Sequence, residues 1–138
     1  MILTTGAPRV TIIDDHDLDV ELTRIALDQV APDALVTHHD DPEEALRELT
    51  TPGVLPDLVL LDLNMPGLHG HDVLTALRAH PLTAHVKIVV CSTSGRDHDR
   101  QRSLTLGADA YLVKPLTEHE LVTALTALLA VPTAGHAC

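Results

Sequence analysis

Five reactive side chains in this sequence of 138 residues follow or close short apolar segments; they are Asp14, Asp15, Asp62, Ser92 and Lys114. Three carboxylates brought together repel one another, and their pKa values rise unless a cation joins them. Carboxylate oxygens without a set of sulfur or imidazole ligands suit Mg²⁺, or Mn²⁺ in its place. A lysine and a hydroxyl group opposite the metal could hold the oxygens of a transferred phosphoryl group. One aspartate could accept that group as an acyl phosphate.

The segment before Asp62 best indicates how these side chains are positioned. Residues 58–61 are Leu-Val-Leu-Leu, a continuous apolar run that is typical of a strand buried on both faces in a parallel sheet. Asn64, Met65 and Pro66 then end the strand and begin a loop. Asp62 is therefore expected at the carboxyl edge of a sheet, where open α/β folds bind ligands.

Strands and helices are predicted to alternate along the whole chain. Strands are expected at 9–13, 34–38, 57–61, 86–91 and 110–113, and helices at 18–30, from 42 onward, around 73–80, at 97–106 and at 121–130. Because such alternation requires right-handed crossovers, the predicted fold is α/β, with a five-stranded parallel sheet that is doubly wound, (βα)5. We expect a single domain over 1–138, with a core of about 9–130 and a mobile tail at 131–138.

Three local motifs predict helix boundaries. Asp41 followed by Pro42 is typical of an N-cap and the first helical position. Gly107 is placed to end a helix, because glycine is the usual residue at C′. Thr117 and Glu120 have the spacing of a capping box that opens the last helix.

Composition excludes several functional classes. The net charge of −11 argues against direct binding to nucleic acid, whose phosphates would repel the chain. Cys91 and Cys138 lie far apart in the sequence, and no pairing is implied, which suits a reducing compartment. The start of the chain has no signal-peptide pattern, and no segment reaches a membrane-spanning length. We therefore expect a cytoplasmic protein with no membrane or nucleic-acid partner.

Asn64 bears on whether the site would turn over a substrate. A phosphoaspartyl-type hydrolase, the main alternative function, needs a second acid two residues after its nucleophile as general acid and base. Asn64 occupies that position, and its amide cannot ionise. A flavin-binding module of similar topology is a further alternative, but Asp14 and Asp15 would repel the flavin phosphate. The sequence therefore favours a protein that stores a phosphoryl group and is not an enzyme, beyond promoting its own phosphorylation and dephosphorylation.

Over residues 9–130 the chain resembles the receiver domains of two-component response regulators. The resemblance rests on Asp14-Asp15, the D-x-N-M-P-G-x-x-G stretch at 62–70, Ser92, and Y-x-x-K-P at 111–115. It implies a flavodoxin-like strand order 2-1-3-4-5, with Asp62 as phosphoacceptor. Asp15 and Asp62 would bind Mg²⁺ by carboxylate, Asn64 by its backbone carbonyl, and Asp14 largely through water. Lys114 would contact the phosphoryl group, and Pro115 would follow a cis peptide bond.

The same resemblance implies a conformational switch. Ser92 would move its hydroxyl to the new phosphoryl oxygens, and Tyr111 would turn inward to fill the vacated space. The affected surface would be the fourth helix, fifth strand and fifth helix. With no effector domain in the sequence, output would pass through protein contacts, kinase feedback or phosphate relay. A degenerate receiver that works only by contact is disfavoured, because all the chemical groups are present.

A narrower resemblance points to the small regulators that accompany bacterial phytochrome kinases. It rests on D-V-E-L-T-R-I-A-L from Asp19 and on the hydroxyl cluster from Ser92. It implies a sensor histidine kinase as partner, a bacteriophytochrome among the candidates, and a homodimer through the fourth-helix, fifth-strand, fifth-helix face.

Four positions depart from the usual receiver pattern. Ser92 stands where threonine is commoner, and it lacks the methyl group but keeps the hydroxyl. His16 follows the acidic pair and His69 lies in the loop after Asp62, so either could make the pocket respond to pH near neutrality. Leu116 replaces the aromatic residue that often follows the Lys-Pro pair. None of these substitutions removes a required group.

Ordinary structural roles remain open for several of these residues. Asp14 and Asp15 could cap the following helix, and Ser92 could be a local turn hydroxyl. Lys114 could lie at a solvated strand end, and Tyr111 could be a core tyrosine. The ten histidines are scattered and lack the spacing of a closed structural metal site.

Overall fold

A computed structural model of the chain describes residues 7–130. Five parallel strands form one sheet in the order β2-β1-β3-β4-β5, which confirms the predicted α/β fold and strand order. The strands are β1 (Arg9–Ile13), β2 (Leu35–His39), β3 (Leu58–Asp62), β4 (Lys87–Ser92) and β5 (Ala110–Val113). The helices are α1 (Asp17–Val30), α2 (Pro42–Leu49), α3 (Gly70–Ala79), α4 (Asp97–Thr105) and α5 (Glu118–Ala130). The predicted tail at 131–138, with Cys138, lies outside the described residues.

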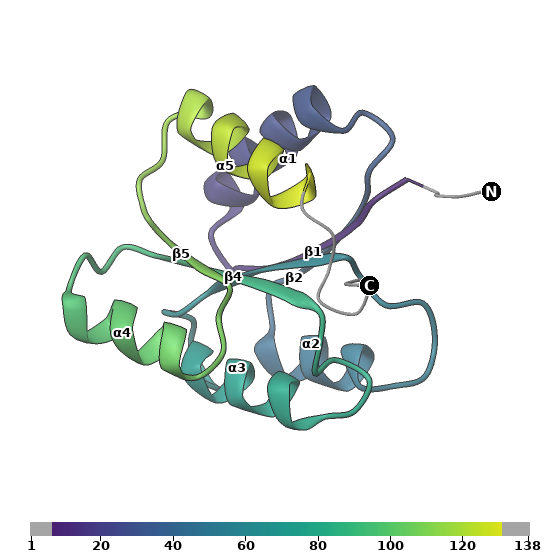
Figure 1. Cartoon of the computed structure of the whole chain (residues 1–138), viewed down its shortest axis with the longest axis vertical. Helices are drawn as coiled ribbons and strands as arrows, with labels where there is room; N and C mark the ends of the chain where they lie inside the picture. Colours follow the sequence, from purple (N-terminus) through teal and green to yellow (C-terminus); the bar gives the residue numbers. More distant parts are fainter. Residues whose placement is uncertain (1–6, 131–138) are drawn as a thin grey trace.

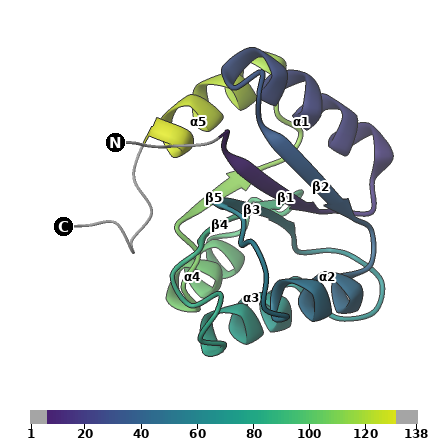
Figure 2. The same ribbon diagram turned by 90° about the vertical axis from the view of Figure 1, so that its right-hand side faces the viewer.

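Two helical layers enclose the sheet. Helices α1 and α5 cover one face, and α2, α3 and α4 cover the other (Figure 1). The same separation is visible after a quarter turn (Figure 2). Within residues 7–130, no helix has the length and hydropathy that crossing a bilayer requires.

Strand β3 is central and buried at every position, as its apolar run predicts. Its side chains alternate between the two faces. Val59 and Leu61 pack into the cluster under α2 and α3. Leu58 and Leu60 pack into the cluster under α1 and α5. This double burial anchors the strand that carries Asp62.

The local boundary motifs are confirmed. The side chain of Asp41 accepts a hydrogen bond from the Glu43 backbone N–H, with Pro42 at the first helical position. Gly107 follows α4 with φ of +112°. The capping box is reciprocal: the backbone N–H groups of Thr117 and Glu120 each donate to the other residue's side chain.

Three strands differ from the prediction by one residue at each end. They are Leu35–His39 instead of 34–38, Leu58–Asp62 instead of 57–61, and Lys87–Ser92 instead of 86–91. The last two strands extend to Asp62 and Ser92 because the ladder continues: Asp62 pairs with Cys91, and Ser92 pairs with Val113. Both polar residues are therefore fixed by sheet register and not only by a loop.

Candidate functional site

The sheet register assembles the predicted site residues at one edge. Ile13 lies beside Leu61, so Asp14 and Asp62 are neighbours at the ends of β1 and β3. Ser92 pairs with Val113, which places Lys114 just beyond the end of β5. Because all five strands are parallel, their carboxyl ends meet at the same edge. The polar residues predicted from the sequence are thus brought together.

Lys114 is the buried cation of the site. Its Nζ donates to Asp14 Oδ2 at 2.8 Å and to Asp19 Oδ2 at 3.0 Å, and it lies 3.7 Å from Asp62 Oδ1. Burial by itself would lower the pKa of Lys114, but the hydrogen bond and charge of Asp14, with Asp19 and Asp62, outweigh burial and raise it. The lysine therefore stays charged. It is not at a solvated strand end, because its side chain is only 9% exposed.

The pKa of Asp14 is shifted in the opposite direction, downward. Burial acts to raise its pKa, but the hydrogen bonds from Lys114 and from the backbone of His16 lower it overall. Helix capping is not its role, because α1 begins at Asp17 and its N-cap residue is His16, with no side-chain cap. The Asp14 Oδ1 atom instead accepts from the His16 backbone N–H at 2.9 Å.

Asp62 is a buried carboxylate with an incomplete set of partners. The residue is 2% exposed, and its Oδ2 has no hydrogen-bond partner. Its Oδ1 accepts a long bond of 3.3 Å from the Asn64 backbone N–H. Burial raises the pKa of Asp62; Lys114 opposes that rise, and the charge of Asp14 adds to it. A buried carboxylate in this state needs a further positive charge.

His16 completes the cluster, although its position there was not predicted. Its Nδ1 lies 3.0 Å from Asp14 Oδ1, 3.2 Å from Asp15 Oδ1 and 3.3 Å from Asp62 Oδ2. The hydrogen bond with Asp14 is the main reason that the pKa of His16 is raised. The sequence showed that His16 follows the acidic pair, but no spacing rule indicated which way its ring points. Asp19, the second acceptor for Lys114, was likewise not predicted.

The site fits a divalent cation. Asp15 Oδ1 and Asp62 Oδ2 are the two buried side-chain polar atoms without a hydrogen-bond partner in residues 7–130. Asp14, Asp15, His16 and Asp62 each offer one possible ligand atom, and these four atoms all lie within 4.8 Å of one another. Unpartnered carboxylate oxygens facing one point are what an ion that prefers oxygen ligands requires.

Ser92 belongs to a second, hydroxyl-rich part of the site. Its Oγ accepts from the Asn64 side-chain amide at 3.3 Å and from the Ser94 backbone N–H at 3.0 Å. The Ser92 hydroxyl therefore does stabilise the local turn, and it also contacts the loop after Asp62 directly. Ser92 itself is fully buried.

Ser94, which the prediction did not single out, links Ser92 to the neighbouring elements. Its backbone carbonyl accepts from the Tyr111 hydroxyl at 2.8 Å, and its own hydroxyl donates to Asp99 of α4. Tyr111 is 6% exposed and points into the core. The core role considered for Tyr111 is thus realised here. The expected inward turn stays a prediction, because this structure shows only the inward position.

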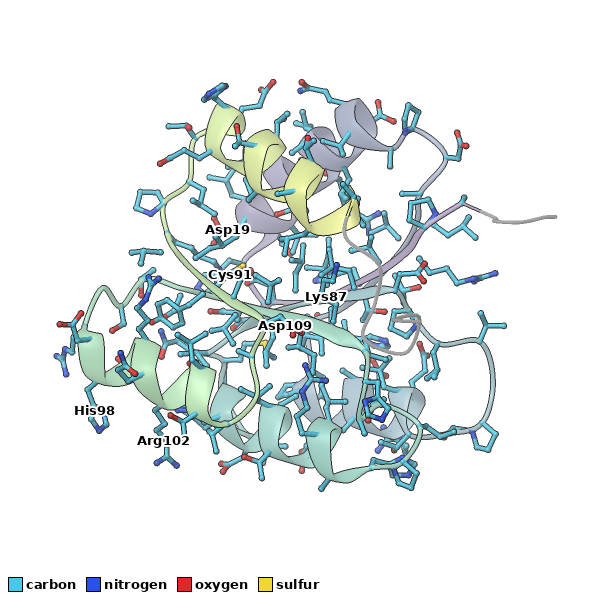
Figure 3. All side chains as sticks on the ribbon, viewed as in Figure 1. Asp19, Lys87, Cys91, His98, Arg102 and Asp109 are labelled. Atoms are coloured by element: carbon cyan, nitrogen blue, oxygen red, sulfur yellow. The ribbon has the colours of Figure 1, made fainter. Side chains whose placement is uncertain are left out.

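The predicted cis bond is present between Lys114 and Pro115. A small cavity lies next to Lys114, between the sheet and helices α1 and α5. Among its lining residues are Asp19 and Cys91, which are labelled in Figure 3. Burial raises the pKa of the Cys91 thiol to about 12. The thiol is therefore neutral at physiological pH and does not compete with Asp62 as a nucleophile.

The loop after Asp62 depends on two glycines in different ways. A Cβ atom on Gly70 would lie 2.5 Å from Leu63 Cα and 2.9 Å from the Asp62 carbonyl oxygen. Gly67 has φ of +89° but open space around it. We expect Gly70→Ala to lower the free energy of unfolding by about 3 kcal/mol through backbone overpacking, and Gly67→Ala by about 1 kcal/mol. Urea unfolding of both variants tests this order, and equal costs would contradict the packing explanation.

A buried polar contact joins this loop region to α4. His69 is the N-cap residue of α3, and its Nδ1 accepts from the His71 backbone N–H. His71 is 6% exposed, and its Nε2 lies 2.8 Å from Ser103 Oγ. Because the Ser103 hydroxyl donates to the Asp99 carbonyl, the His71 Nε2 carries a hydrogen and donates to Ser103. Ser103 is the one buried residue of α4, so this contact is a main attachment of that helix.

His71 should make stability depend on pH. Burial lowers its pKa, with help from the nearby charges of His69 and Arg102. As pH falls below about 6.5, the unfolded chain takes up a proton that folded His71 resists, so the free energy of unfolding falls. His71→Gln should lack this loss, and its deficit relative to the wild type should shrink as pH is lowered from 8 to about 5. Urea unfolding across this range is the measurement. A deficit that is constant with pH would show that His71 does not titrate differently in the two states.

The chain is similar in sequence to known proteins. The family model described as "Response regulator receiver domain" matches residues 10–126. The transcriptional regulatory protein PrrA of Mycobacterium leprae (strain TN) is 42% identical over 124 residues, which are 90% of this chain and 51% of PrrA. The chain spans about half the length of the curated relatives that it matches.

Two solved structures are similar over nearly the whole chain. The phosphorylated cyanobacterial phytochrome response regulator RcpA has a TM-score of 0.83 and 26% identity, with coverage of 94% of this chain and 99% of RcpA. The Mn²⁺-bound form of response regulator Rcp1 has a TM-score of 0.77 and 25% identity, with coverage of 89% and 92%.

Proposed function

Because the chain belongs to the family of response regulator receiver domains, we propose that it stores a phosphoryl group received from a sensor histidine kinase on Asp62. An oxygen of Asp62 forms the bond to phosphorus while the bond from phosphorus to the donor's leaving group breaks. The observation that carries this proposal is the buried Asp62 carboxylate, with Oδ2 unpartnered and Lys114 3.7 Å from Oδ1.

The chain's own residues divide the work between two sides of Asp62. Asp15 and Asp62 would hold a divalent cation by their side chains and Asn64 by its backbone carbonyl, with Asp14 beside them. When bound, Mg²⁺ or Mn²⁺ would neutralise the carboxylates and offset charge on the phosphoryl oxygens. Lys114 would hold one phosphoryl oxygen from the opposite side. The Mn²⁺-bound form of Rcp1 supports this assignment of the acidic cluster.

Asn64 supports storage of the phosphoryl group over repeated hydrolysis. Its side-chain amide donates to Ser92 Oγ, and an amide cannot act as general acid or base. The chain would therefore promote its own phosphorylation and dephosphorylation without turning over other substrates. Sustained hydrolysis of a phosphomonoester by the purified chain would favour the alternative, a phosphoaspartyl-type hydrolase.

The hydrogen-bond network around Ser94 provides a route for the signal. When the Ser92 hydroxyl turns to a phosphoryl oxygen, it gives up its bonds from Asn64 and from the Ser94 backbone. Ser94 is then free to move, and it carries the contacts to Tyr111 and to Asp99 of α4. Phosphorylation would therefore change the surface of α4, β5 and α5.

Partner surfaces are proposed on two sides. Helix α1 exposes an apolar ridge of Leu18, Leu22 and Ile25, and Leu22 also lines the cavity beside Lys114; we place the histidine kinase contact there. A bacteriophytochrome is one candidate, because RcpA is described as a phytochrome response regulator. A homodimer is proposed through α4, β5 and α5, where Leu104 and Val113 are exposed. A cytoplasmic location stays a prediction.

Intact-mass measurement tests the proposal. The purified chain is incubated with a small acyl phosphodonor and Mg²⁺, and hydrogen exchange is compared before and after. We expect the mass of one added phosphoryl group and faster or slower exchange over 97–130. An unmodified chain contradicts phosphoryl storage, and a modified chain with unchanged exchange there contradicts the proposed switch surface. Transfer from a panel of histidine kinases then identifies the partner.

A further inference from the structure

The ring of His16 occupies a position between three carboxylates. Its Nδ1 lies 3.0, 3.2 and 3.3 Å from oxygens of Asp14, Asp15 and Asp62. His16 is the N-cap residue of α1, but its side chain makes no capping hydrogen bond. The ring is therefore not needed for the helix end. Its side chain is 52% exposed, so solvent reaches the ring.

Three hydrogen bonds cannot explain these three contacts. A ring nitrogen has either one hydrogen or one lone pair, and the hydrogen-bonding geometry is satisfied only towards Asp14 Oδ1. Asp15 Oδ1 and Asp62 Oδ2 remain without a hydrogen-bond partner, although Asp62 is 98% buried. The nitrogen and the unpartnered oxygens thus surround a point that a hydrogen atom does not satisfy.

The spacing of these atoms matches a metal coordination shell. With metal–ligand distances of about 2.1 Å, adjacent ligands of an octahedral ion lie about 3.0 Å apart. Adjacent ligands of a tetrahedral ion lie about 3.4 Å apart. The three distances from His16 Nδ1 fall within this range. The four residues of the cluster also each offer one possible ligand atom within 4.8 Å of the others.

Lys114 does not compete for this position. Asp14 directs Oδ2 to Lys114 and Oδ1 to His16. Asp62 likewise has Oδ1 on the side of Lys114 and Oδ2 on the side of His16. Asp14 and Asp62 therefore each have one oxygen toward the lysine and the other toward the imidazole. The point beside His16 stays available while the lysine keeps its own contacts.

We propose that His16 binds the divalent cation directly through Nδ1 and gives the site a preference for Mn²⁺ over Mg²⁺. Imidazole nitrogen is a good ligand for transition metals, whereas Mg²⁺ prefers oxygen ligands and keeps its water. Replacing one water by nitrogen therefore stabilises bound Mn²⁺ more than bound Mg²⁺. The inference rests on the proposed function, because the carboxylates of the same site supply the other ligands.

Pulsed EPR of the Mn²⁺-loaded chain provides a test that does not depend on phosphorylation. We expect a nitrogen hyperfine coupling in the wild-type chain that changes when histidine is labelled with ¹⁵N, and that is lost in His16→Ala. The matched control is His98→Ala, which removes a histidine that projects from α4 away from the sheet (Figure 3). This control should keep the coupling.

Calorimetric titration measures the preference itself. Because losing even a residue that only supports a ligand costs about 10–100-fold in affinity, we expect His16→Ala to weaken Mn²⁺ binding by at least about tenfold. Mg²⁺ binding should change less. Wild-type Mn²⁺ binding without nitrogen coupling, or unchanged or tighter Mn²⁺ binding by His16→Ala, would overturn the role of His16 and leave the carboxylate site intact. Failure of the wild type to bind either ion would overturn the inference together with the metal site.

Discussion

Asp62→Asn is expected to abolish phosphorylation of the chain while making the metal-free protein more stable. The amide cannot form the bond to phosphorus, so intact mass should show no added phosphoryl group after incubation with an acyl phosphodonor and Mg²⁺. The gain in stability arises because Asp62 is 2% exposed and its pKa is raised by burial. At neutral pH the charged carboxylate therefore destabilises the fold, and removing that charge should raise the free energy of unfolding.

The gain in stability of Asp62→Asn should depend on pH. A carboxylate with a raised pKa in the folded state costs stability above that pKa, and the cost disappears as pH falls below its unfolded value. The advantage of Asp62→Asn should therefore shrink toward pH 4. Asp57→Asn is the matched control, since Asp57 lies before the other end of β3 and accepts from the Arg9 backbone. An Asp62→Asn chain that still gains one phosphoryl group would refute the acceptor assignment.

Lys114→Met is expected to be strongly destabilising. It leaves the buried carboxylates of Asp14 and Asp62 without their cation, and Asp19 loses a hydrogen bond. Breaking a buried ion pair from one side typically costs about 3–5 kcal/mol; since water reaches Asp19, we expect about 3 kcal/mol. Urea unfolding without divalent ions measures this loss.

Two further measurements separate the effect of the Lys114 charge from the effect of its side-chain packing. Lys87→Met removes the chain's other lysine, whose Nζ bonds to the Leu128 carbonyl at the opposite edge of the sheet. It should leave the carboxylate cluster unaffected. Mg²⁺ should restore more stability to Lys114→Met than to the wild type, because the ion replaces part of the missing charge. A loss that Mg²⁺ does not reduce would show that the packing of the lysine stem, and not its charge, stabilises the site.

Asp14 adds a distinct pH signature to the same variant. The pKa of Asp14 is lowered in the folded chain because bonds from Lys114 and His16 outweigh burial. Its contribution to stability is therefore present above its ordinary pKa and is lost as pH falls through the folded value. Without Lys114 this contribution is smaller. The difference in free energy of unfolding between the wild type and Lys114→Met should therefore become smaller as pH falls.

The positions of the main-chain elements could be predicted from short-range patterns. The apolar run 58–61 can satisfy its burial only in a central strand. The Asp41-Pro42 and Thr117–Glu120 motifs act within a few residues, so their hydrogen bonds follow from the sequence alone. The site was predicted for a related reason: parallel strands place their ends together, whatever the helices between them contain.

Side-chain direction and long-range polar contacts could not be predicted in this way. His16 follows the acidic pair, but whether its ring faces the carboxylates depends on the backbone at the start of α1. The role of Ser94 depends on its hydrogen bonds with Tyr111 of β5 and Asp99 of α4. These two residues belong to different elements. His71 and Ser103 are 32 residues apart, and neither belongs to an apolar stripe that would indicate burial. These contacts are set by tertiary packing, which no local pattern encodes.

Asp62, in a cluster of acids joined by a divalent cation, is proposed to accept one phosphoryl group. Intact mass followed by peptide mapping, after incubation with an acyl phosphodonor in Mg²⁺ and separately in a chelator, tests this proposal most directly. We expect one phosphoryl group on Asp62 in Mg²⁺ and almost none in the chelator. Equal modification without divalent ions, or a phosphoryl group on another residue, would contradict it.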